Sequence, residues 1–153
     1  MSRVNNPDKS LPYHIRGAFR GFETALSRYL AEIDLPLSQF YILRHQWDEQ
    51  GYQQSDIAEK ACMSESVASQ VIKKMEASGL VKRKADPNDS RKRRVVLTPR
   101  GKTLREEVMM HGINLSKNHG PRISREDMMT TISVLIEVKK AFDLYNASSA
   151  TKV

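Results

Sequence analysis

The sequence, 153 residues long, lacks several features that define whole classes of protein. It contains a single cysteine, so an intrachain disulfide cannot form, and this suits a reducing cytoplasm. No stretch approaches the roughly 18 consecutive apolar residues that a membrane span requires. Residues 1–17 hold no apolar segment typical of a signal peptide. We therefore expect a cytoplasmic protein with no membrane partner.

Patterns of catalysis and metal binding are also lacking. Four histidines are spread along the chain without the clustered His and carboxylate ligands of a metal site: His14, His45, His111 and His119. There is no nucleophile–base arrangement, no phosphate-binding loop and no dinucleotide fingerprint. We expect no enzyme activity, no cofactor and no regulatory metal.

Positive charge is abundant and concentrated. The formal net charge is +7, and one short segment carries much of the excess. Asp86 and Asp89 are the only acids there, among these basic residues: Lys82, Arg83, Lys84, Arg91, Lys92, Arg93 and Arg94. Such a segment favours a nucleic-acid partner, although a solvated hairpin, a phosphate site or a membrane-surface patch has the same composition.

Apolar periodicity predicts a mainly helical chain. Residues 1–10 are polar and are expected to form a mobile lead-in. Apolar residues then recur at three- and four-residue steps from Leu11 to Ile33. Ser38 is expected to cap the next helix, which Gly51 ends. A short helix follows at about 54–61, with either Gln53 or Ser55 as its cap. A longer helix begins at Ser64 and stops before Gly79.

The longer helix and the segment after it predict a winged helix-turn-helix over residues 35–98. In the helix, an apolar face of Val67, Ala68, Val71, Ile72 and Met75 is expected to be buried. The segment 80–98 reads as a β-hairpin wing, because the turn-forming run 86–89 separates two strands. Cys62, in the corner before the longer helix, is expected to be a small core residue.

Helices flank this region on both sides. Thr98 and Pro99 start one helix, which the run 118–121 ends, and Ser124 and Asp127 form a capping pair for the last. The segments 11–34 and 99–147 retain apolar surface after one small domain is packed. We therefore expect them to form a dimerisation region with a second copy, although they would alternatively complete a monomeric core. Residues 148–153 are expected to fray.

The chain resembles the MarR family of bacterial transcription regulators. The matching motifs are Leu35–Leu43, Ser55–Glu59 and Ser64–Val81, followed by Asp86–Arg91 and Leu97–Gly101. The resemblance implies a mainly α fold with a small β-hairpin wing, N- and C-terminal dimerisation helices, a homodimer and an operator of double-stranded DNA with two half-sites. It also implies a small aromatic or phenolic effector that releases the DNA.

The predicted DNA-binding residues come from the outer face of the longer helix and from the wing. Gln can pair with adenine, Ser can bind base edges or phosphates, and Lys and Arg neutralise phosphates. Arg91 is expected to enter the minor groove, and Asp89 is expected to brace either Arg91 or the backbone of the turn. The set is Ser64, Ser66, Ser69, Gln70, Lys73, Lys74, Lys82, Lys84, Asp89, Arg91, Lys92 and Arg93.

An effector pocket is a further hypothesis. Aromatic walls and a carboxylate-pairing cation can be drawn from Tyr13, His14, Arg16, Arg20, Phe40, Arg44 and Trp47. The same aromatics serve equally well as core and the arginines as surface. The patterns predict a sequence-specific DNA-binding protein, and the resemblance implies that it is a repressor released by a small molecule. The alternative is a ligand-independent architectural or anti-silencing regulator. A winged helix used for protein contact would have a less basic wing.

Overall fold

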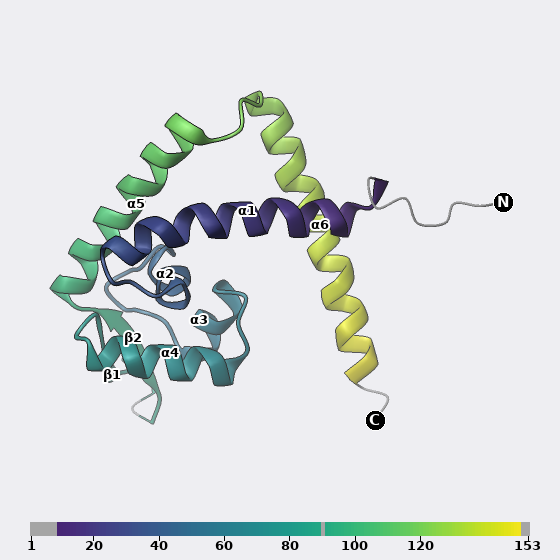
Figure 1. The fold of residues 1–153 in the computed structure, drawn as a ribbon. Coiled ribbons are helices and arrows are strands. Elements are labelled where there is room, and N and C mark those ends of the chain that lie inside the picture. The colour runs from purple at the N-terminus through teal and green to yellow at the C-terminus, as the bar shows by residue number, and fades with distance from the viewer. Residues whose placement is uncertain (1–8, 90, 151–153) are drawn as a thin grey trace. The chain divides into compact units, whose positions relative to one another are not determined.

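The computed structural model describes residues 9–89 and 91–150, so part of the predicted lead-in and the end of the tail lie outside the described residues. The chain divides into two compact units, Met1–Asn114 and Leu115–Val153, and each is described by itself. The first unit contains α1, α2, α3 and α4, then the antiparallel hairpin of β1 and β2, and then the start of α5 (Figure 1). The predicted mainly α fold with a β-hairpin wing is confirmed.

Helix α1, Leu11–Glu32, is the long helix predicted at the start of the chain, with Pro12 in its first turn. Only its second half contributes to the core, through Leu26 and Leu30. Asp34 has a positive φ of 50° and turns the chain into α2. The first half instead exposes large apolar side chains: Leu11, Tyr13, Ile15, Phe19 and Phe22.

Helix α2, Leu37–Leu43, differs from its prediction at both ends. Its N-cap is Pro36, so Ser38 lies inside the helix and does not cap it. The helix ends well before Gly51, which has a positive φ of 71° and packs directly against the backbone carbonyl of Val95. A Cβ at that position would collide with this carbonyl, so the glycine permits the chain to approach strand β2.

Helices α3, Gln54–Lys60, and α4, Glu65–Ala77, form the helix-turn-helix. Gln53 caps α3 in a reciprocal capping box with Asp56, which resolves the choice between Gln53 and Ser55. In the corner between the helices, Cys62 has a φ of 53° and is exposed. The predicted burial of Cys62 is therefore wrong. The left-handed residue turns its side chain outward, while the neighbouring Ala61 and Met63 pack against the core.

The wing consists of β1, Val81–Ala85, and β2, Arg93–Leu97, paired antiparallel with Val81 opposite Leu97 and Ala85 opposite Arg93. Strand β2 also bonds on its other edge, where the backbone of Val95 exchanges hydrogen bonds with Tyr52 at 2.8 and 3.0 Å. The wing is thus anchored to the segment that leads into α3.

One apolar cluster holds α4 and the wing in place. It includes Phe40, Ile42 and Leu43 of α2, Ile57 of α3, and Val95 and Leu97 of β2. Helix α4 contributes Val71, Ile72 and Met75, and α1 and α5 reach the same cluster with Leu26, Leu30 and Val108. Packing of this kind fixes orientation, because a close-packed interior has no room for a rotated helix.

Helix α5, Pro99–His119, begins as predicted, with the Thr98 hydroxyl accepting from the Gly101 amide at 3.1 Å. In the second unit, α6 spans Arg125–Ala150 and is capped by Ser124 and Asp127 as predicted. It extends through residues 148–150, which were expected to fray. Most of its large apolar side chains are exposed: Met128, Met129, Ile132, Val134, Leu135, Ile136, Phe142, Leu144 and Tyr145.

Candidate nucleic-acid interface

Helix α4 presents a polar face to solvent, opposite the side that packs on the core. Ser66, Gln70, Lys73 and Lys74 are exposed and Ser69 is half-buried, as the periodicity predicts. In Figure 1 the helix lies along the edge of the first unit, beside the hairpin. Val67 is a correction to the sequence analysis. It was placed in the core, but 45% of it is exposed, because it lies at the border of the buried face, whose remaining members are 7% exposed or less.

The start of α4 is fixed by its own serines. Ser64 is the N-cap, and its hydroxyl accepts from the Val67 amide at 3.3 Å. The Ser66 hydroxyl lies 3.2 Å from the Ser64 hydroxyl. Both serines are exposed, at the positive end of a helix of thirteen residues. This end can bind a phosphate or a base edge while the cap holds its geometry.

The wing apex presents a single arginine. The Arg91 side chain is 89% exposed, and its Nε donates to Asp89 Oδ1 at 3.2 Å. The same carboxylate oxygen accepts from the Arg91 backbone amide at 3.1 Å. These two bonds from Arg91 lower the pKa of Asp89 below its ordinary value, so the brace stays ionised. The predicted bracing of Arg91 by Asp89 is what the structure contains.

The wing base is held by an ion pair that the sequence analysis did not identify. Arg94 Nε donates to Asp86 Oδ2 at 2.6 Å, and Arg94 Nη1 donates to the Gly51 carbonyl at 3.0 Å. The Asp86 carboxylate also accepts from the Asn88 amide at 2.9 Å. The bond from Arg94, and then that from Asn88, lower the pKa of Asp86. Strand register alone would not have found this pair, because Arg94 lies opposite Lys84 and Asp86 bonds through its backbone amide to Lys92.

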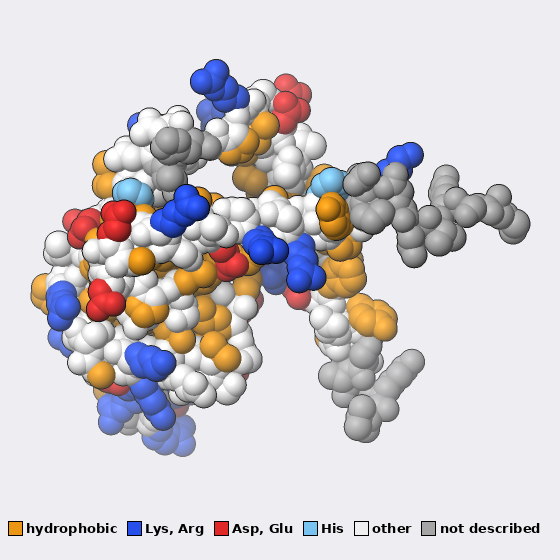
Figure 2. All heavy atoms as spheres, in the orientation of Figure 1, with side chains coloured by type: hydrophobic (Ala, Val, Ile, Leu, Met, Phe, Trp, Pro, Cys, Tyr) orange, Lys and Arg blue, Asp and Glu red, His pale blue; other side chains and the backbone are white. Residues whose placement is uncertain are grey.

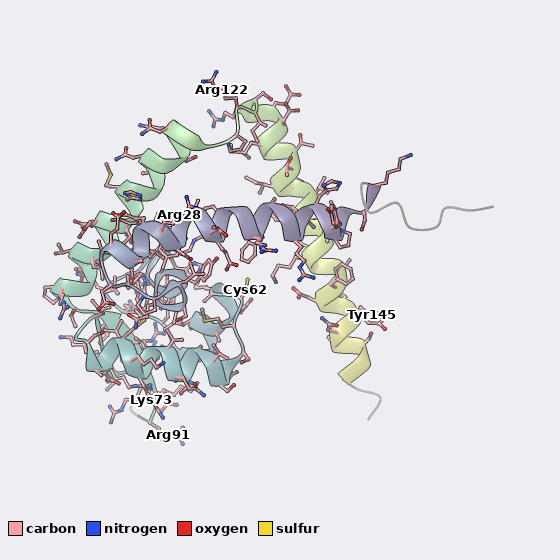
Figure 3. All side chains as sticks on the ribbon, in the orientation of Figure 1. Arg28, Cys62, Lys73, Arg91, Arg122 and Tyr145 are labelled. Carbon is pink, nitrogen blue, oxygen red and sulfur yellow. The ribbon has the colours of Figure 1, made fainter. Side chains whose placement is uncertain are left out.

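The other basic residues of the wing divide into anchors and outward-facing side chains. Arg83 pairs with Glu76 of α4 at 3.3 Å, and Lys84 donates to the Glu49 carbonyl, so both tie the hairpin to neighbouring segments. Lys82, Lys92 and Arg93 are exposed. Figure 2 shows Lys and Arg side chains gathered over the hairpin and α4, and in Figure 3 Lys73 and Arg91 project from the same side.

The seven residues of the predicted effector pocket have different surroundings. Tyr13, His14, Arg16 and Arg20 lie on the exposed first half of α1. Phe40 is buried and stacks edge-on against Tyr41. Arg44 is exposed, whereas the half-buried Trp47 donates its indole N–H to the Ile42 carbonyl at 3.3 Å. A pocket among these residues stays a prediction.

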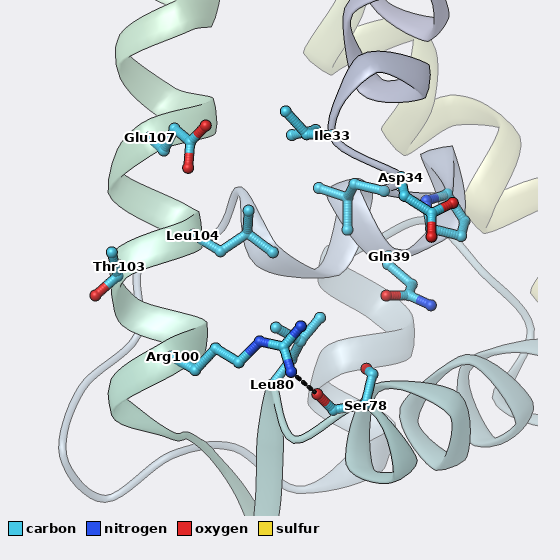
Figure 4. A pocket seen from close by; sticks show the side chains of 11 residues that line it. Ile33, Asp34, Gln39, Ser78, Leu80, Arg100, Thr103, Leu104 and Glu107 are labelled. Atoms are coloured by element: carbon cyan, nitrogen blue, oxygen red, sulfur yellow. Dashed lines mark hydrogen bonds between the residues drawn. The ribbon is translucent and has the colours of Figure 1, made fainter.

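A hollow of about 620 Å³ lies elsewhere in the first unit, lined by the α1–α2 corner, the end of α4 and the start of α5 (Figure 4). Arg100 Nη1 donates to the Ser78 carbonyl at the C-cap of α4 with a length of 2.9 Å. Leu35, Leu80 and Leu104 supply apolar wall, and Asp34 and Glu107 supply carboxylates. The hollow therefore borders the helix whose polar face is described above.

Within residues 9–89 and 91–150, no helix is long and apolar enough to cross a membrane. Across the same residues, no three His, Cys, Asp or Glu side chains gather where they could hold a metal ion.

Comparison with known proteins agrees with this architecture. A sequence model described as the MarR family matches residues 35–92. The transcriptional regulator TtmR of Methylorubrum extorquens is 29% identical over 101 residues, which are 66% of this chain and 52% of TtmR, so the match spans about half of that relative. Residues 35–92 thus match the sequence pattern of the MarR family, and the relatives that match this chain are transcriptional regulators.

Solved structures show the same fold. CouR from Rhodococcus jostii RHA1, bound to p-coumaroyl-CoA, superposes with a TM-score of 0.79 at 17% identity, covering 90% of this chain and 95% of CouR. The S. aureus MepR–DNA complex gives a TM-score of 0.73 at 19% identity, covering 86% of this chain and 98% of MepR. The winged-helix prediction is confirmed by these likenesses.

Proposed function

We propose that this protein binds a specific sequence of double-stranded DNA through α4 and the wing. The observation that carries the proposal is the pairing of two exposed elements on one rigid frame. Helix α4 exposes a polar face, as a helix that reads the major groove does, and Arg91 is exposed at a turn that Asp89 braces. The exposed residues Lys73, Lys74, Lys82, Lys92 and Arg93 would neutralise phosphates on either side.

The protein binds this DNA as a homodimer. Exposed apolar side chains along the first half of α1, on Met110 and Ile113 of α5 and along α6 support this, because a lone soluble chain rarely exposes so many. A two-fold dimer presents two copies of α4 to half-sites one helical turn apart, which multiplies the specificity of each.

Repression is the simplest consequence of such binding. A dimer that occupies two adjacent major grooves excludes other proteins from the duplex it covers. The protein has to share a compartment with the chromosome, so we place it in the cytoplasm. A reporter gene behind the bound sequence should be expressed more strongly when this protein is removed, whereas weaker expression would identify an activator.

Arg91→Ala is the direct test of the DNA interface. We expect the variant to bind a duplex selected from a random pool at least about tenfold more weakly, since it loses a charged contact in the groove. Fluorescence anisotropy measures the affinity, and the dimer should persist. Arg122→Ala, which removes the same charge from the connection between α5 and α6, is the matched control. Equal affinity of both variants and wild type at physiological salt would refute the assignment.

Release of the DNA by an aromatic or phenolic acid completes the proposal. CouR, whose fold this chain shares, was solved with an aromatic acyl thioester. Two places can receive an acid: the predicted set around Arg20, and the hollow beside Arg100. A guanidinium has five N–H donors, so Arg100 can hold Ser78 and pair with a carboxylate at the same time.

Thermal shift and DNA-release assays with salicylate and a panel of aromatic acids test this step. Loss of the response in Arg100→Ala would assign the acid to the hollow, and loss in Arg20→Ala would assign it to the predicted set. No response to any acid in either assay would favour the ligand-independent regulator.

A further inference from the structure

Val67 is a partly exposed apolar side chain on α4, the helix that we propose contacts DNA, and it has no part in the contacts proposed above. It is the third residue of α4, and 45% of it is exposed. Ala68, Val71, Ile72 and Met75 form the buried face of the same helix. Val67 therefore gains little from burial in the first unit.

Folding gives no reason for valine at this position. A β-branched residue in a helix restricts its own rotamers and costs a few tenths of a kcal/mol relative to alanine. The Ser64 cap uses the backbone amide of Val67 and not its side chain. An exposed alanine or a polar residue would serve the helix better.

The position of Val67 points to the DNA. In a helix-turn-helix, residues near the N-terminus of the recognition helix contact base edges in the major groove. Val67, Gln70 and Lys74 follow at steps of three and four residues, so they form one row along the exposed side of α4. The row offers an apolar group, an amide and an ammonium in that order.

We propose that Val67 contacts the C5 methyl group of a thymine, and that it specifies this base in each half-site. The thymine methyl is the apolar group that a natural base pair presents in the major groove. Gln70, one turn further along α4, has the amide that pairs with adenine N6 and N7. The row thus selects a thymine close to an adenine. This inference rests on the proposed DNA binding.

Substitution of deoxyuridine for thymine tests the contact, because it removes the methyl group and leaves base pairing intact. The probe is a duplex selected by the wild-type protein from a random pool, with each thymine replaced in turn. We expect one thymine per half-site at which the replacement weakens wild-type binding about fourfold, and about fifteenfold when both half-sites are changed, from the value of one buried methylene.

The variant Val67→Ala should bind the thymine duplex as weakly as wild type binds the deoxyuridine duplex, and it should not respond to the replacement. Val67→Thr, which keeps one methyl group, should show an intermediate response. The melting temperature of Val67→Ala should match that of wild type, which separates lost contact from lost structure.

The contrary results are distinct. A deoxyuridine profile that is the same in wild type and Val67→Ala would overturn the role of Val67 while leaving DNA binding intact. Failure of the pool to yield any bound duplex would overturn the proposed function, and the inference with it.

Discussion

Helices α4 and α6 carry their apolar residues in opposite circumstances. In α4, the four residues that face the core are at most 7% exposed, and its outer face is almost entirely polar. In α6, Val138 is half-buried, and the other large apolar side chains are exposed, from 38% for Leu135 to 73% for Leu144. Helix α4 is stabilised by packing within its own chain, whereas α6 leaves most of its apolar surface exposed.

This contrast suggests that DNA contacts and the association of two protomers depend on different parts of the chain. The apolar cluster under α4 and the wing is completed by α1 and α5 of the same chain, so we infer that its geometry does not depend on another copy. The wing is likewise fixed internally by Asp86, Arg94 and Gly51. We infer that DNA contacts are set within each protomer, while the outer helices set the spacing between two of them.

The same substitution should mainly affect stability in α4 and mainly affect self-association in α6. Ile72→Ala removes a fully buried side chain of α4 and should lower the free energy of unfolding by about 2–5 kcal/mol, since it leaves a cavity. Ile136→Ala on α6, where the side chain is 48% exposed, should change it far less but weaken self-association. Urea denaturation across a range of protein concentrations measures both. Equal losses of stability in the two variants would break the comparison.

A charge on the apolar face of α6 should separate assembly from folding. Leu135→Glu places a carboxylate where we expect the second copy, and burying it unpaired is costly. The dimer should dissociate at micromolar concentration, and DNA affinity should fall by about a hundredfold or more, because avidity is lost. Ser133→Glu, on the polar side of the same helix, is the control. Sedimentation that shows Leu135→Glu as a dimer would contradict the assigned surface.

Two aspartates of the wing should have small and separable effects, one on stability and one on DNA binding. Asp86→Asn removes the partner of Arg94 at the wing base and should lower the melting temperature by several degrees. Asp89→Asn frees Arg91 at the apex and should weaken DNA binding while leaving the melting temperature nearly unchanged. Calorimetry and anisotropy on both variants distinguish these outcomes. Equal changes of melting temperature and DNA affinity in the two variants would show that the wing base and the wing apex do not have different roles.

The pH dependence of the Asp86 effect follows from its lowered pKa. A carboxyl group whose pKa is lower in the folded than in the unfolded protein stabilises the fold above its ordinary value of 3.8. This stabilisation is lost as pH falls below 3.8 towards the folded pKa. The difference in stability between wild type and Asp86→Asn should therefore be constant at neutral pH and shrink below that value.

Local signals in the sequence predicted most of the fold. Pro12, the Ser64 cap, Gly79, the 86–89 turn, Thr98 and the Ser124–Asp127 pair each mark a boundary that the structure contains. These signals succeed because each acts through bonds within a few residues of the chain. The polar face of α4 and the hydrogen bonds between Asp89 and Arg91 could also be predicted from residues close together in the sequence.

The misses depend on contacts between distant segments. Gly51 looked like a helix stop, but its role is set by Val95 of β2, and Arg94 is bound to Gly51 across 43 positions. Cys62 and Val67 were assigned to the core because apolar type and period favour it, yet a positive φ turns one outward and the edge of the packed face exposes the other. No pattern in a single sequence records these neighbours.

A hydroxyl-radical footprint on the selected duplex tests the central claim most directly. In a dimer, the α4 helices and wings of the two protomers should protect two half-sites whose centres are about ten base pairs apart. Arg91→Ala should lose protection in the minor groove beside each half-site and keep the spacing. Two results would contradict the claim that each protomer sets its own DNA contacts while the outer helices set the spacing. One is protection of a single continuous patch, and the other is a spacing that changes with Arg91→Ala but not with Leu135→Glu.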